Sequence, residues 1–283
     1  MTRTPDTSSP AHRSRHRAGP RPYALCAALV MLAATSASVA AADGGPGPLG
    51  VTAVAVSTPQ SARVGALIPA DRTGDLTDSH FCTASVVRSP HHNLVVTAAH
   101  CLSDGTDLVF APGYRDGTAP YGLWRVRARF IPEGWSRDQD EDSDLAFAAL
   151  EPRDDAGNGH SGGGDDDGDG DGGENVEDVV GGNRFATGTA TGATAVTLTG
   201  YPDSRDEPIR CTNKPRRQGG SQQRIDCPEF TAGTSGSPWV NGDREVVGVL
   251  GGHEEGGLTP DTSYSVVLGA EAAELYEEAA AAS

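Results

Sequence analysis

Two blocks of short apolar runs, separated by turn residues, constrain the fold of this chain most strongly. The first block spans residues 63–152 and the second spans 179–283. The runs are too short for most helices, and they include Val64–Ile68, Thr83–Val87, Leu94–Ala99, Leu145–Leu150, Ala195–Thr199 and Glu245–Leu250. Turn residues lie between them, in a chain with 37 Gly and 19 Pro. This pattern predicts an all-β protein built from barrels or sandwiches.

Two segments of these blocks have a distinct pattern. Trp124–Phe130 alternates arginine with apolar or small residues, which predicts a strand with one solvent-facing side. The tail from Gly269 to Ala280 is rich in Ala and Glu, which predicts a C-terminal helix. We expect that helix to pack against the second block.

The N-terminus has the three parts of a secretory signal peptide. Residues 1–22 carry five Arg and one Asp, an apolar stretch follows from Tyr23 to about Ala34, and small residues end at Ala42. An uncleaved anchor is the alternative, but a bilayer takes about 20 apolar residues. We therefore predict a signal peptide at 1–42, an N-terminal segment or pro-region at 43–62, and a secreted, extracellular protein.

An acidic spacer at 153–178 separates the two blocks. It is rich in Asp and Gly and has few apolar residues, so it buries too little surface to offset the entropy of ordering, and disorder is expected. The alternative is a calcium loop, because the spacing of four acidic residues resembles an EF-hand loop: Asp167, Asp169, Asp171 and Asp178. Against it, Glu174 stands where an apolar residue is usual, and no cofactor is expected.

Four cysteines remain once Cys26 is removed with the signal peptide: Cys82, Cys101, Cys211 and Cys227. An even number in an exported chain predicts disulfides. The local pairings, Cys82–Cys101 and Cys211–Cys227, are preferred. A zinc site fits poorly, because no C-x-x-C or H-x-x-x-H spacing accompanies these cysteines.

The chain carries a formal net charge of −17. Such a charge disfavours binding to nucleic acid and to anionic membranes, which are themselves negative. Beyond the leader, no apolar run is long enough for a membrane span. We expect no nucleic-acid partner, no membrane association after signal cleavage, and a monomer.

Three short segments carry the residues for acyl transfer: Thr97-Ala98-Ala99-His100-Cys101, Asp142-Ser143-Asp144-Leu145-Ala146 and Gly233-Thr234-Ser235-Gly236-Ser237-Pro238. A serine hydroxyl needs a base with a pKa near neutrality, and histidine supplies one. The histidine needs a buried carboxylate to fix its tautomer. The order His, Asp, Ser differs from that of α/β-hydrolases and of subtilisins. It predicts a triad of His100, Asp144 and Ser235.

Glycines flank the serine, so the backbone can approach a substrate closely. The main-chain N–H groups of Gly233 and Ser235 are the expected oxyanion hole, which stabilises the charge of a tetrahedral intermediate. Asp140 and Asp142 are rivals to Asp144, but they lie in a charged run and are expected to be solvated.

Taken together, the three segments resemble the trypsin/chymotrypsin-like serine peptidases, particularly their secreted bacterial members. The resemblance covers about Val64 to Leu268, with 153–178 as an insertion. It implies two perpendicular six-stranded β-barrels with the triad in the cleft between them. It also implies that Cys82–Cys101 braces the loop beside the histidine.

The chain departs from the family pattern beside the nucleophile. Thr234 stands where animal members carry an aspartate that binds the new N-terminus after zymogen cleavage. Activation at the similar-looking Arg63-Val64-Gly65 is therefore not expected. Ser237 replaces the second glycine after the nucleophile, a change we expect to be tolerated.

The substrate-binding residues are less constrained by the sequence. The resemblance places Glu229 at the base of the primary pocket, where it would favour Arg or Lys before the scissile bond, although Phe230 could fill that position instead. Gly251 and Gly252 would form the opposite wall. His253 could prefer an acidic substrate residue, as in glutamyl endopeptidases, or lie on the surface.

Three functions remain open. The leading hypothesis is a secreted serine endopeptidase that acts on proteins or peptides through an acyl-enzyme. The second is a catalytically silent, protease-like binding module. The third is a calcium-dependent surface protein built around the acidic spacer.

Overall fold

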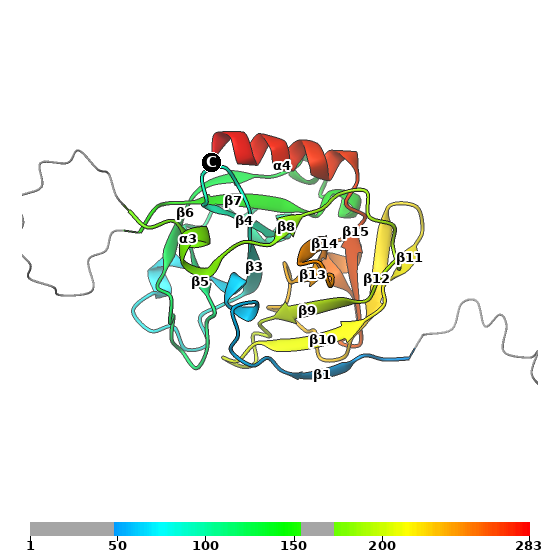
Figure 1. Ribbon diagram of the computed structural model, residues 1–283, viewed down its shortest axis with the longest axis horizontal. Coiled ribbons are helices and arrows are strands. Elements are labelled where there is room, and N and C mark those ends of the chain that lie inside the picture. The colour runs from blue at the N-terminus through cyan, green and yellow to red at the C-terminus, as the bar shows by residue number, and fades with distance from the viewer. Residues whose placement is uncertain (1–47, 154–172) are drawn as a thin grey trace, which may run out of the picture. The chain divides into compact units, whose positions relative to one another are not determined.

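Six strands of the first block close into a barrel in the computed structural model, which describes residues 48–153 and 173–283 (Figure 1). The strand order is β2-β3-β4-β7-β6-β5, and β5 pairs with β2 to complete the circle. The strands are β2 (Val64–Pro69), β3 (Cys82–Val87), β4 (Leu94–Thr97), β5 (Leu108–Pro112), β6 (Trp124–Phe130) and β7 (Ala146–Leu150). Short helical segments lie between them: η2 (Ala70–Arg72), η3 (Ala99–Cys101), α2 (Glu133–Asp138) and η4 (Glu141–Ser143).

Strands β4 and β7 are buried on both faces, which explains why they have continuous apolar runs rather than alternation. Val95 and Ala148 point into the barrel core. Leu94, Val96 and Phe147 face a second core shared with the other half of the protein. In strand β6 the predicted alternation is seen in the first four residues, where Arg125 and Arg127 are exposed beside the buried Trp124 and the half-buried Val126, and the last three residues are half-buried.

The second half of the protein, which is the second block together with the N-terminal strand β1, forms two sheets. A six-stranded sheet has the order β1-β10-β9-β13-β14-β8, and a three-stranded sheet has the order β11-β12-β15. The strands are β1 (Val51–Val54), β8 (Arg184–Phe185), β9 (Val196–Gly200), β10 (Ile209–Asn213), β11 (Arg216–Gln218), β12 (Gln222–Asp226), β13 (Pro238–Val240), β14 (Glu245–Val249) and β15 (Thr262–Val266). Trp239, Leu198 and Ile225 share their core. The all-β prediction is confirmed. Unlike the first half, whose six strands close into one barrel, this half consists of two separate hydrogen-bonded sheets.

The C-terminal helix α4 (Ala270–Ala282) is confirmed, and it packs against the first barrel as well as against the expected second block. Its main contacts are with β7 and β6 of the first barrel, as Figure 1 shows. Tyr276 of α4 packs against Phe147, with ring centroids 5.7 Å apart. The outer face of β7 is apolar and needs a cover, and α4 supplies it.

The residues before the first barrel belong partly to the second half. Strand β1 pairs with β10 at the edge of the six-stranded sheet, and η1 (Ser61–Arg63) then leads into the barrel. Val64 is buried and pairs with Ser85 of β3. The bond after Arg63 therefore lies at the start of a barrel strand, where a new chain end would disturb the ladder. The predicted signal peptide, residues 1–42, and most of the acidic spacer lie outside the described residues.

Both predicted disulfides are formed. Cys82 of β3 is joined to Cys101 of η3, and Cys211 of β10 is joined to Cys227.

The double replacement Cys211→Ala/Cys227→Ala is expected to lower the free energy of unfolding by about 3 kcal/mol, because it reopens a loop of sequence separation 16. Urea denaturation measures this loss. Since neither cysteine lines the cavity that contains His100 and Ser235, kcat should stay within about twofold of wild type; a larger loss of kcat would contradict its purely structural role.

Candidate active site

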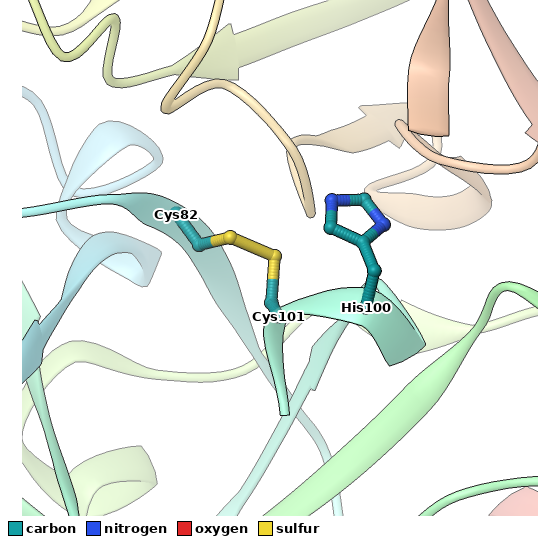
Figure 2. A group of neighbouring side chains, drawn as sticks. All are labelled: Cys82, His100 and Cys101. Carbon is teal, nitrogen blue, oxygen red and sulfur yellow. A yellow bond between two sulfur atoms is a disulfide. The ribbon is translucent and has the colours of Figure 1, made fainter. Parts of the chain in front are cut away.

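His100 lies in the short η3 turn directly after strand β4. Its neighbours Ala99 and Cys101 are buried, and the Cys82–Cys101 disulfide ties the turn to strand β3. Figure 2 shows the imidazole beside this disulfide. Both cysteine sulfurs are consumed in the disulfide, so they offer no thiolate to a metal. The disulfide thus fixes the backbone that carries the histidine.

Asp144 follows η4 and is completely buried. Its Oδ2 lies 2.8 Å from His100 Nδ1, and its Oδ1 accepts a hydrogen bond of 3.0 Å from the main-chain N–H of His100. Oδ2 also accepts a hydrogen bond of 2.8 Å from the N–H of Gly252, in the second half. Three N–H donors therefore satisfy a buried carboxylate and orient the imidazole.

The two rival aspartates have other partners. Asp140 caps η4, where its side chain accepts from the N–H of Asp142 at 3.0 Å. Asp142 in turn accepts from Nε2 of Gln222 at 2.9 Å. Neither carboxylate bonds to His100 among the described residues. The loop therefore brings only Asp144 to the histidine.

Ser235 lies in a loop between two glycines that the backbone requires. Gly233 has φ +88°, and a Cβ there would lie 2.5 Å from the nitrogen of Asp203. Gly236 has φ +85°, and a Cβ there would lie 1.9 Å from the carbonyl oxygen of Thr83. The N–H of Thr83 donates to the Ser235 carbonyl at 2.7 Å. The loop is thus held directly against the first barrel.

The N–H groups of this loop alternate in their use. The N–H of Thr234 donates to Thr231, and that of Gly236 donates to Leu250. The N–H groups of Gly233 and Ser235 find no acceptor among the described residues. Two unpaired donors on either side of Thr234 form the arrangement that an oxyanion hole needs.

His100 and Ser235 line one cavity of about 520 Å³. Its other walls are Phe81, Cys82 and Leu250 together with the segments 230–234 and 254–260. No hydrogen bond joins the Ser235 hydroxyl to the imidazole among the described residues. Such bonds commonly shorten only when substrate is bound.

The four predicted substrate-binding residues are not among the residues that line this cavity. Glu229 has an exposed side chain that pairs with Arg205 at 3.3 Å, outside the wall of this cavity. His253 pairs with Glu141 at 3.1 Å and also lies outside the wall. Gly251 and Gly252 pack against Asp144 and Gln222, where any Cβ would clash.

The wall segment 254–260 was not identified from the sequence. It contains Glu254 and Glu255, both with φ near +50°, followed by Gly256 and Gly257. The adjacent glycines, after a predicted strand, were the available signal for a sharp turn. Phe230, the alternative pocket residue, does line the cavity.

Three of the four predicted calcium ligands, Asp167, Asp169 and Asp171, lie outside the described residues. The fourth, Asp178, lies in helix α3 (Val176–Val180), and its Oδ1 is 2.6 Å from Nδ1 of His92. This aspartate therefore already has a partner in the first barrel's turn.

The hydrogen bond that His92 donates to the Asp178 carboxylate, followed by the negative charge of that carboxylate, raises the pKa of His92 above the ordinary value. The protonated imidazole is the better donor, so the pairing stabilises the fold below about pH 6.5 and is lost as pH rises through the folded-state pKa. In an NMR titration, Asp178→Asn is expected to lower the pKa of His92. An unchanged titration would contradict the pairing.

The described helices include none long and apolar enough to cross a membrane.

No match is found among curated proteins. Among solved structures, the protease Anisep from Arthrobacter nicotinovorans is 24% identical, with 82% of this chain and 100% of that chain covered and a TM-score of 0.63. The thermostable serine protease AL20 from an extremophilic microorganism is 26% identical, with 80% and 100% covered and a TM-score of 0.63.

A Glu endopeptidase, solved in complex with MPD, is 17% identical, with 83% of this chain and 98% of that chain covered and a TM-score of 0.60. This likeness concerns the fold. A family model described as a trypsin-like peptidase domain matches residues 82–249, which include His100, Asp144 and Ser235. The chain therefore belongs to the family of trypsin-like peptidase domains.

Proposed function

We propose that this protein is a secreted serine endopeptidase whose catalytic triad is His100, Asp144 and Ser235. The observation that carries the proposal is the buried Asp144 carboxylate bonded to His100 Nδ1, in a turn that shares a cavity with Ser235. This arrangement leaves Nε2 of the imidazole as the nitrogen that can act on the serine hydroxyl.

In the proposed reaction, Ser235 Oγ attacks the scissile carbonyl while Nε2 of His100 takes the hydroxyl proton. The oxyanion of the tetrahedral intermediate accepts hydrogen bonds from the N–H groups of Gly233 and Ser235. The imidazolium then gives its proton to the leaving amine, and an acyl-enzyme forms. Water, activated by the same imidazole, attacks the ester and regenerates the hydroxyl.

We place the substrate side chain before the scissile bond in the cavity beside Ser235. Its walls combine apolar groups of Phe230 and Leu250 with the Gly256–Gly257 turn. Glu229 points to Arg205 instead, which removes the support for a trypsin-like preference based on that residue. A peptide library that varies this substrate position tests the assignment.

Two disulfides support the proposed secretion, because such bonds persist in oxidising compartments. The predicted signal peptide points the same way. Analysis of the culture medium and N-terminal sequencing of the exported protein would locate the mature end.

A fluorophosphonate probe, which reacts with activated serines, tests the catalytic proposal. Mass spectrometry is expected to find the label on Ser235, and Ser235→Ala should remain unlabelled. Absence of label on folded wild-type protein would instead favour the catalytically silent binding module. The alignment of His100 with a buried carboxylate, which a binding module does not need, favours the enzyme.

A further inference from the structure

Ser237, two residues after the proposed nucleophile, has a completely buried side chain with one hydrogen-bond partner among the described residues. Its Oγ donates a hydrogen bond of 2.7 Å to the carbonyl oxygen of Thr234. The main-chain N–H of Ser237 donates to the same oxygen at 3.0 Å. One carbonyl is therefore anchored twice, once by the backbone and once by a side chain.

The anchored carbonyl belongs to the peptide unit that carries the N–H of Ser235. A peptide unit is planar, and its C=O and N–H point in opposite directions. Fixing the oxygen of Thr234 therefore fixes the direction of the Ser235 N–H. A hydrogen bond to the carbonyl also polarises the unit and strengthens its N–H as a donor.

The other expected donor is anchored in a parallel way, but without a side chain. The N–H of Gly233 shares its peptide unit with the carbonyl of Ala232, which accepts a hydrogen bond of 2.8 Å from the N–H of Asp203. Both donor-bearing units are thus held by their oxygens. Only the unit before Ser235 depends on a hydroxyl that substitution can remove.

The Ser237 hydroxyl fits because of Gly200, at the end of strand β9. A Cβ on Gly200 would lie 2.0 Å from the hydroxyl oxygen of Ser237 and 3.3 Å from its Cβ. The space beside the Gly200 backbone is therefore filled by the Ser237 side chain, and it has no room for a side chain on Gly200 as well.

We propose that Ser237 is a positioning residue of the oxyanion hole: its hydroxyl holds the Thr234–Ser235 peptide unit so that the Ser235 N–H points at the developing oxyanion. This inference rests on the proposed serine-peptidase function. It predicts an effect in the transition state and little effect on substrate binding.

The first test compares Ser237→Ala with Ser265→Ala. Ser265 is equally buried, and its hydroxyl donates to the carbonyl of Val266 at 2.8 Å and accepts from the N–H of Val249 at 2.9 Å. Removing a whole oxyanion donor costs about 10²–10³ in kcat. Because the N–H of Ser237 still holds Thr234, Ser237→Ala should lower kcat by about tenfold with KM within about twofold.

A transition-state analogue provides a second readout. Binding of a peptide aldehyde, which forms a tetrahedral adduct, should weaken by about the same factor as kcat in Ser237→Ala. A non-cleavable peptide of the same sequence should bind unchanged. Ser265→Ala is expected to lower the melting temperature but to leave both kcat and aldehyde binding within about twofold of wild type.

The double variant Gly200→Ala/Ser237→Gly separates the effect of lost packing from the effect of the lost hydroxyl. It refills the space beside the Gly200 backbone with one methyl group, so stability should recover relative to Ser237→Gly alone, while kcat stays about tenfold low. Recovery of kcat in the exchange variant, or a wild-type kcat in Ser237→Ala, would overturn the positioning role. If wild type itself fails to react with a fluorophosphonate, the proposed function and this inference fail together.

Discussion

Replacing Ser235 by alanine is expected to lower kcat for peptide hydrolysis by about 10⁶-fold, with KM changed by less than about threefold. In the proposed reaction the Ser235 hydroxyl oxygen forms the acyl-enzyme, whereas the hydroxyl of the neighbouring Thr234 donates a hydrogen bond of 2.6 Å to the carbonyl of Thr231. The residual rate would come from substrate positioning and the N–H groups of Gly233 and Ser235.

Steady-state kinetics with a chromogenic peptide measures this loss. Ser204→Ala, an exposed serine in the nearby loop after β9, is the matched control and should retain wild-type kcat. A Ser235→Ala protein that kept more than about a hundredth of wild-type kcat would require a different nucleophile.

The second large effect is expected for Asp144→Asn, about 10⁴-fold in kcat. Both carboxylate oxygens accept hydrogen bonds: Oδ1 from the N–H of His100, Oδ2 from His100 Nδ1 and the N–H of Gly252. An amide in that site must turn its NH2 group against one of these donors. If it faces Nδ1, the ring proton moves to Nε2, and the base needed by Ser235 is lost.

Asp142→Asn separates this effect from a general loss of negative charge in the same loop. Asp142 accepts a hydrogen bond from Gln222 and makes none to His100 among the described residues. The kcat of the Asp142→Asn variant should therefore stay within about threefold of wild type. In wild-type protein, NMR should detect the Nδ1 proton of His100 that Asp144 holds. Equal kcat values for Asp144→Asn and Asp142→Asn would remove Asp144 from the proposed triad.

The residues whose chemistry is specified by short segments were predictable from the sequence. His100 follows an apolar run, Asp144 precedes one, and Ser235 lies between two glycines; only their order and residue types were needed to group them. The disulfides followed from an even cysteine number and from proximity in the chain. These inferences needed no knowledge of which strands pair.

Features that depend on contacts between distant segments were not predictable. The sequence does not show that Gly252 donates to Asp144, or that residues 254–260 line the cavity. Helix α4 carries alanines that suit many surfaces, so its packing on β7 was not specified locally. Strand β1 is mostly exposed and pairs with β10 through its backbone, so it left no periodic pattern.

The Asp144–Gly252 hydrogen bond joins the two halves of the protein at the carboxylate of the proposed triad. A second bond, from the N–H of Thr83 to the carbonyl of Ser235, joins them at the proposed nucleophile. Neither half holds a working set of groups by itself. Turnover therefore depends on how the two halves are docked. A small displacement of one half relative to the other would abolish activity while every strand stayed intact. Enzymatic inactivation would then precede any loss of circular dichroism signal.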